Sequence, residues 1–135
     1  MSYPSEPLEG TTPLISDRFI LTFQAGAAIT MGQALYLNAS DGQVYPTNAA
    51  NQLTFVGIAL TSQSTIGKKV SVVCRGLARF IAYGTPAVAD QLTTGGPGYP
   101  QGSLMTDNTS KNTTVVGLCT VAPGSSGGTG VVMLW

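Results

Sequence analysis

The sequence contains no histidine, and this absence removes several classes of function at once. Histidine is the usual general base, the commonest metal ligand and the side chain that titrates near neutral pH. A Ser-His-Asp triad is therefore impossible. The candidate acids each lie in or beside an expected turn, where Asp makes local hydrogen bonds: Asp17, Asp41, Asp90 and Asp107. We therefore expect that the protein is not an enzyme and has no catalytic residues.

Cysteine is also scarce, since the chain has only Cys74 and Cys119, far apart in sequence. Without histidine and without a CxxC pair, no metal site is expected. Both cysteines lie in apolar, strand-like runs, so a disulfide between them is conceivable, but buried free thiols are commoner in a protein made in the cytosol. The glycine-rich stretches fit neither the Walker nor the dinucleotide spacing, so no cofactor is expected.

Charge is low and balanced, with six basic and six acidic residues that make up 9% of the chain. Nucleic acid and anionic membranes demand clustered Lys and Arg, so neither is expected as a partner. No apolar run approaches the ~20 residues of a membrane-spanning helix, and the first thirty residues show no signal peptide. A surface with so little charge instead favours a homo-oligomer.

What the sequence does contain is a repeat. The run 55–60 (FVGIAL) followed by 70–76 (VSVVCRG) returns sixty residues later as 115–120 (VVGLCT) followed by 130–135 (GVVMLW). Gly57 thereby matches Gly117, and a glycine inside a strand indicates a close backbone approach. A repeat of this period predicts two similar β-units, each too small to bury its own apolar face, packed on one another.

The remaining pattern is also that of strands. Residues 17–23 (DRFILTF) are rich in β-branched and aromatic side chains, residues 34–38 alternate, and Asp41-Gly42 is a strong hairpin signal. Gly76 interrupts the run 70–82 as a bulge or corner. No window shows a helical stripe. We predict an all-β, compact barrel-like or sandwich-like domain over residues 17–135, with an internal repeat of about 24–82 and 83–135.

Residues 1–16 differ from the rest, because they contain Pro4, Pro7 and Pro13 and no periodic pattern. Proline removes backbone donors, so the segment cannot enter a regular ladder on its own. It is either a frayed terminus or an extended arm that becomes ordered on a partner. The partner-binding residues of such an arm are Tyr3, Pro4, Leu8, Leu14 and Ile15. Arg75 and Arg79 could form ion pairs across a subunit contact, although a solvated surface position is the plainer interpretation.

The order and spacing of these pieces resemble a known family. Gly32-Gln33-Ala34-Leu35-Tyr36, the 41–46 run DGQVYP, the 55–59 run FVGIA and the 70–76 run are similar to small capsid decoration, or cement, proteins of tailed bacteriophages and related viruses. The resemblance spans roughly residues 24–135. Each piece is a generic strand-and-turn motif, and the specificity lies in their order.

This resemblance implies a virion structural protein that binds the outer surface of the assembled head. It would bridge subunits of the major capsid protein, often as a trimer, after synthesis in the host cytoplasm. In such proteins the N-terminal segment commonly reaches over the major capsid protein and adds to its sheet. The three prolines of residues 1–16 limit that pairing, while apolar docking remains open.

Two other functions stay open on the sequence. One is a self-assembling subunit of a tube or filament, in which the arm docks onto the next copy. Another is a carbohydrate-binding module of the head surface, which would need an exposed aromatic platform built from Tyr45, Tyr83 or Tyr99.

Overall fold

The computed structural model describes residues 18–49, 54–95, 99–107 and 115–135. These residues contain nine strands and no helix, which confirms the all-β prediction. The predicted arm, residues 1–16, lies outside the described residues. The strands are β1 (Phe19–Gln24), β2 (Ala34–Leu37), β3 (Val44–Pro46), β4 (Phe55–Ala59), β5 (Lys69–Ile81), β6 (Gln91–Thr94), β7 (Leu104–Thr106), β8 (Gly117–Val121) and β9 (Thr129–Leu134).

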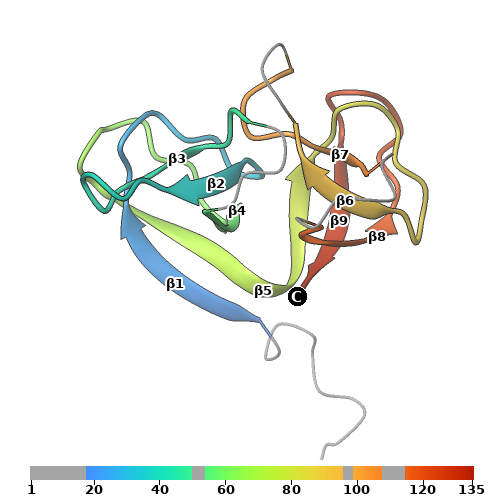
Figure 1. Ribbon diagram of the computed structural model, residues 1–135, viewed down its shortest axis with the longest axis horizontal. Coiled ribbons are helices and arrows are strands. Elements are labelled where there is room, and N and C mark those ends of the chain that lie inside the picture. Colours follow the sequence, from blue (N-terminus) through green and yellow to red (C-terminus); the bar gives the residue numbers. More distant parts are fainter. Residues whose placement is uncertain (1–17, 50–53, 96–98, 108–114) are drawn as a thin grey trace, which may run out of the picture.

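All nine strands belong to one antiparallel sheet, in the order β3-β2-β4-β5-β9-β8-β6-β7, with β1 paired to β5. The sheet curls into two lobes, and the long strand β5 runs from one lobe into the other (Figure 1). The first lobe contains β1 to β4, and the second contains β6 to β9. An isolated bridge spans each lobe, Ala25 with Val44 in the first and Ala82 with Leu104 in the second.

The bend in β5 lies at Gly76, which has a positive φ of 89°. This left-handed conformation is strained for residues with a side chain, so glycine is the residue suited to it. On one side of the bend Arg75 pairs with Phe19 of β1, and on the other Gly76 pairs with Leu134 of β9. The predicted corner at Gly76 is therefore confirmed, and it is the point at which the start of β1 and the end of β9 meet.

The two lobes repeat the same strand pairing. In the first, β4 pairs with β5 through Ile58 and Val73, and in the second β8 pairs with β9 through Leu118 and Met133. In the first lobe, β1 pairs with residues 69–75 of β5, and in the second lobe residues 76–81 of β5 pair with β9 in the same way. Residues 76–81 thus take the place of β1 in the second lobe. We call residues 19–75 unit 1 and residues 76–135 unit 2.

This pairing places the boundary between the units at Gly76, whereas the sequence suggested about residue 82. The difference arises because β1 resembles residues 76–81 only weakly in sequence, although the registers are equivalent. Phe23 opposite Val70 corresponds to Phe80 opposite Gly130. The isolated bridge of Ala25 with Val44 likewise corresponds to that of Ala82 with Leu104.

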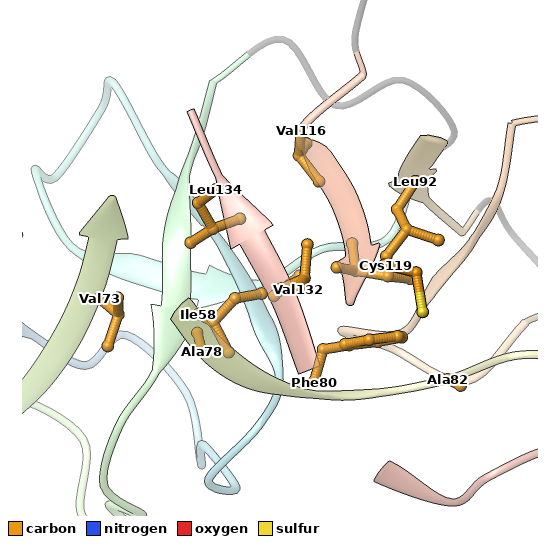
Figure 2. Close-up of a cluster of buried hydrophobic side chains, with 12 residues drawn as sticks. Ile58, Val73, Ala78, Phe80, Ala82, Leu92, Val116, Cys119, Val132 and Leu134 are labelled. Atoms are coloured by element: carbon orange, nitrogen blue, oxygen red, sulfur yellow. The ribbon is translucent and has the colours of Figure 1, made fainter. Parts of the chain in front are cut away.

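Two buried clusters form the core, and they differ in composition. The smaller belongs to unit 1 alone: Ala25, Ile29, Leu35, Val44, Ala59, Val70 and Val72. The larger fills unit 2 around Phe80 and also includes Ala34, Ile58 and Val73 of unit 1 (Figure 2). The alternation of β2 explains this division, since Leu35 points into one cluster and Ala34 into the other. The units therefore bury apolar surface on one another, as the repeat predicted.

Each unit enters its second strand through the same turn. In unit 1 the Thr30 backbone N–H donates to Gln33 Oε1 at 2.8 Å, and in unit 2 the Ala87 N–H donates to Asp90 Oδ2 at 2.9 Å. The residue before the acceptor has a positive φ in both, 94° at Gly32 and 76° at Ala89. Different side chains therefore build one backbone shape, which a comparison of residue types alone does not show.

Candidate interaction surface

The most exposed apolar strand of the protein is β1. Its sequence FILTFQ has the β-branched and aromatic residues that favour a strand, yet Phe19, Ile20 and Leu21 all have exposed side chains. Among the described residues β1 pairs only with β5. The register shifts between Phe19 and Ile20, which locally interrupts the alternation of faces. Adjacent large apolar side chains of this kind mark an interaction surface.

A second group of exposed apolar residues lies on unit 2. Met133 and Val121 are exposed on β9 and β8, and Val88 is exposed on the turn before β6. Trp135 follows β9 near the bend of β5, where Figure 1 marks the C-terminus. Its indole N–H donates to the Val115 carbonyl oxygen at 3.3 Å, which fixes the orientation of a half-exposed ring. Met133, Val121 and Val88 of this second group belong to unit 2, whereas Trp135 follows the end of β9, which meets the start of β1 at the bend.

The charges of the described residues are segregated, although the net charge is zero. The basic residues lie immediately before or on β1 and β5: Arg18, Lys68, Lys69, Arg75 and Arg79. The described acids lie in other segments, Asp41 between β2 and β3, Asp90 before β6 and Asp107 after β7. The described basic residues are therefore distributed along the central strand and at the start of its neighbour, apart from the described acids. The balanced overall charge does not reveal this distribution, but the sequence does show four basic residues within residues 68–79.

The two arginines predicted at a subunit contact have different surroundings. Arg75 is exposed at the end of unit 1, opposite Phe19. Arg79 is exposed on unit 2 and lines a cavity of about 100 Å³ between the units, together with Arg18, Met31, Leu60 and Val73. Arg79 is therefore already part of the contact within the chain, and the subunit contact stays a prediction. The predicted arm residues Tyr3, Pro4, Leu8, Leu14 and Ile15 lie outside the described residues.

The tyrosines considered for a glycan platform form two separate pairs. Tyr36 and Tyr45 stack in unit 1 with ring centroids 5.7 Å apart, and Tyr83 and Tyr99 approach to 4.2 Å in unit 2. Tyr83 of the second pair lines a hollow of about 390 Å³, together with Gly84, Thr85, Asp90, Met105 and Thr106. Tyr45 is thus not part of the same platform as Tyr83 and Tyr99.

The ionisable groups show structural roles. Tyr45 donates a hydrogen bond of 2.5 Å to Asp41, and this bond holds the Asp41 pKa below its usual value and raises the Tyr45 pKa. Burial raises the pKa of the Cys74 and Cys119 thiols, both of which are free. A thiol with a raised pKa is a poor nucleophile at neutral pH.

The described residues also lack two further kinds of feature. They contain no group of three or more His, Cys, Asp or Glu side chains that could hold a metal ion. No helix within the ranges covered by the structure is long and apolar enough to cross a bilayer.

Comparison with known proteins agrees with the resemblance noted in the sequence. The family described as phage cement protein matches residues 9–74, just under half of the chain. This match confirms the resemblance to capsid decoration proteins. It ends one residue before the end of unit 1, so it covers the first copy of the repeat. Among curated proteins, no sequence matches this chain.

A solved structure shares the fold. The head fiber gp8.5 N base of bacteriophage phi29 superposes with a TM-score of 0.63 at 17% sequence identity. The alignment covers 87% of this chain and 94% of that one, so both units are included. At this identity the likeness establishes the fold and leaves the function to other arguments.

Proposed function

We propose, from the premise that unit 1 matches the phage cement protein family, that this chain is a decoration protein of a phage capsid. The observation that carries the proposal is the family match over residues 9–74, which joins part of the N-terminal segment to the first folded unit. The exposed apolar side chains of β1 support it, because adjacent exposed apolar residues are suited to a protein partner. The role is structural and involves no catalysis or cofactor.

The finer parts of the proposal concern where and how the chain binds. Residues 1–16 dock on the outer surface of the major capsid protein through Tyr3, Leu8, Leu14 and Ile15, with Pro4 holding the segment extended. The folded units act as a rigid body that joins neighbouring capsid subunits, as a trimer. Joining them adds buried contact area, which resists the outward pressure of packaged DNA. The fold neighbour is the base of a phage head fiber, so the fold is compatible with a protein of the phage head.

The proposal is tested by co-sedimentation of the purified chain with phage heads that lack it. We expect the full chain to pellet with the heads and to raise their resistance to heat. A chain without residues 1–16 should keep its far-UV circular dichroism and melting temperature and lose most of the binding. Replacing Tyr3, Leu8, Leu14 and Ile15 by Ser should have the same effect, whereas replacing Ser2, Ser5, Thr11 and Thr12 by Ala is the matched control.

Two results would count against the proposal. Full binding by the chain without residues 1–16 would remove the role of the arm. Failure of the intact, folded chain to bind heads at any concentration would remove the capsid function itself.

Glycan binding is a second candidate, and one observation favours it. Tyr83, whose ring contacts that of Tyr99, lines a hollow together with the polar side chains of Thr85, Asp90 and Thr106. An aromatic face beside hydrogen-bonding groups is the arrangement that sugar rings require. Retention of the chain on immobilised glycans should then be lost in Tyr99→Ala and kept in the control Tyr36→Ala. Equal retention of both variants would exclude this platform.

A further inference from the structure

The outer face of unit 1 is buried, whereas the equivalent face of unit 2 is open. Ala34, Ile58 and Val73 form a row across β2, β4 and β5, and strand pairing makes Gln91, Leu118 and Met133 the equivalent row across β6, β8 and β9. We call each row the outer face of its unit. Val73 is 1% exposed, but its counterpart Met133 is 40% exposed. The apolar character is retained at Leu118 and Met133, although nothing among the described residues covers them fully.

The exposure is reversed at one end of each unit's apolar core, where the residues of unit 2 are buried and those of unit 1 are more exposed. Ala78, Phe80, Val116 and Leu134 close this end in unit 2, and all four are buried. Strand pairing and the repeat give the counterparts of these residues in unit 1. We call them the open end of unit 1: Leu21, Phe23, Val56 and Cys74. Ala78 is 4% exposed and Leu21 is 41% exposed, and the other three are only partly buried. The larger apolar residue is thus the more exposed of the two.

Both asymmetries have one cause within the chain. The outer face of unit 1 packs against the interior end of unit 2, so that Ile58, Val73, Ala78 and Leu134 belong to one buried cluster (Figure 2). A backbone hydrogen bond of 3.0 Å, from the Ile81 N–H to the Gly32 carbonyl, reinforces the contact. The protein therefore contains one contact in which the outer face of one unit covers the interior end of the other. Two surfaces are left without such a contact, the outer face of unit 2 and the open end of unit 1.

We propose that these surfaces bind one another between copies of the chain, so that the outer face of unit 2 in one copy covers the open end of unit 1 in the next. The occupant is a second copy because unit 2 presents the same fold, at equivalent positions, as the unit that already covers such an end within the chain. Under this arrangement the Gln24 N–H, the counterpart of the Ile81 N–H, faces the Ala89 carbonyl of the neighbour, the counterpart of Gly32.

The contact is heterologous, because it joins two different surfaces, and repeated use produces a closed ring or an open filament according to the rotation between copies. Its composition suits it to this role. Met133 is unbranched and adapts to an irregular apolar surface, and Leu118 adds further apolar area. These two surfaces would form the contact between subunits of the homo-oligomer in the proposed function. The proposed contact is inferred from the contact within the chain and does not depend on capsid binding.

The test is sedimentation velocity on the full chain over a wide range of concentrations. Leu21→Lys alters only the open end, and Met133→Lys alters only the outer face of unit 2. We expect the unaltered chain to self-associate and each variant to be at least tenfold weaker in association. Ile66→Lys is the matched control, since Ile66 is exposed and belongs to neither surface, so this variant should associate like the unaltered chain. Leu21→Gln and Met133→Gln replace the lysine variants if circular dichroism shows that those fail to fold.

Mixing the two variants distinguishes this arrangement from others. A Leu21→Lys copy retains a functional outer face, and a Met133→Lys copy retains a functional open end, so one intact contact is possible per pair. We expect the mixture to form a heterodimer and nothing larger. No complex in the mixture, despite association of the unaltered chain, would show that the contact is not between these two surfaces.

Two further results would overturn the inference. One is a full chain that stays monomeric at all concentrations, which would leave the capsid proposal standing. Another is association that Leu21→Lys leaves unchanged and that deletion of residues 1–16 abolishes, which would make the arm the occupant. Because capsid binding is not measured in these experiments, their failure is distinct from failure of the proposed function.

Discussion

The carbonyl oxygen of Val73 occupies the space that a Cβ atom on Gly57 would need. The same relationship recurs in the second unit, where the Met133 carbonyl oxygen lies against Gly117. In each unit the strand carrying the glycine therefore lies close to the backbone of the strand beside it, β4 to β5 in unit 1 and β8 to β9 in unit 2. The recurrence of this glycine in the sequence predicted a close backbone approach, and the structure confirms it.

Replacing either glycine should therefore destabilise the fold. Gly57→Val and Gly117→Val force the β4 or β8 backbone away from its neighbour, and we expect each to lower the free energy of unfolding by about 1–3 kcal/mol. Chemical denaturation followed by circular dichroism measures this. Gly124→Val is the control, since a Cβ atom there meets nothing within 4 Å. Unchanged midpoints for both buried variants would contradict the crowding argument.

The turn at Ala89 offers a stabilising change. Ala89 has φ of 76° where the equivalent Gly32 has 94°, and a left-handed conformation costs an L-residue about 1–2 kcal/mol. Ala89→Gly should relieve part of this cost and raise stability by up to about 1 kcal/mol, against a small entropic loss. The converse change, Gly32→Ala, should lower stability, because it also brings a Cβ atom to 3.2 Å from Ile81 Cγ1. Equal melting temperatures for Ala89→Gly and the unaltered chain would contradict the strain.

The sequence was sufficient to predict most of the strands, the corner at Gly76 and the repeat, because each depends on local patterns of apolar residues and glycine. It did not predict β6 and β7, which are short and lie in a stretch rich in turn-forming and polar residues. It was insufficient to place the boundary of the repeat. Phe23 and Phe80 occupy equivalent positions, but the spacing from them to the shared FVGIA-like strand differs between the units, so a constant offset does not align them. Only the hydrogen-bonded register reveals the equivalence.

The sequence was also insufficient to predict which apolar side chains of the strands are exposed. Leu21 and Ala78 are both apolar residues on apolar strands, and their patterns give no reason to expect one exposed and one buried. The difference depends on which unit covers which, a long-range relation that no local pattern encodes. For the same reason the partner-binding residues chosen from the sequence were confined to residues 1–16 and two arginines. The apolar surface of β1 itself was recognised as a strand and not as a surface.

The two equivalent phenylalanines should differ in their contribution to stability. Phe80 is fully buried at the centre of the larger cluster, whereas Phe23 is only partly buried beside the smaller one. We expect Phe80→Ala to cost about 3–5 kcal/mol, the range for a large aromatic side chain removed from a packed core. Phe23→Ala should cost clearly less in a monomeric sample. Similar losses of unfolding free energy for both variants would show that Phe23 is as well buried in unit 1 as Phe80 is in unit 2.

The last prediction concerns pH and the loop between β2 and β3. The hydrogen bond from Tyr45 favours the ionised form of Asp41, so its pKa is lowered below 3.8, and the Gln43 N–H acts in the same direction. The Tyr45 pKa is raised above 10.0, mainly by the same bond. The contribution of Asp41 to stability is therefore present above pH 3.8 and is lost as pH falls through the lowered pKa. That of Tyr45 is present below pH 10.0 and is lost as pH rises through the raised pKa.

Removing the hydroxyl separates these effects. In Tyr45→Phe the Asp41 pKa should move upward towards its ordinary value but not reach it, because the Gln43 N–H still donates to the carboxylate. Carbon-detected NMR titration of the Asp41 carboxyl group measures the shift. Tyr36→Phe is the matched control, since Tyr36 stacks on Tyr45 at 5.7 Å and the hydrogen bond to Asp41 is left intact. An Asp41 pKa that moves equally in both variants would mean that ring stacking, and not the hydroxyl, sets the carboxyl group's environment.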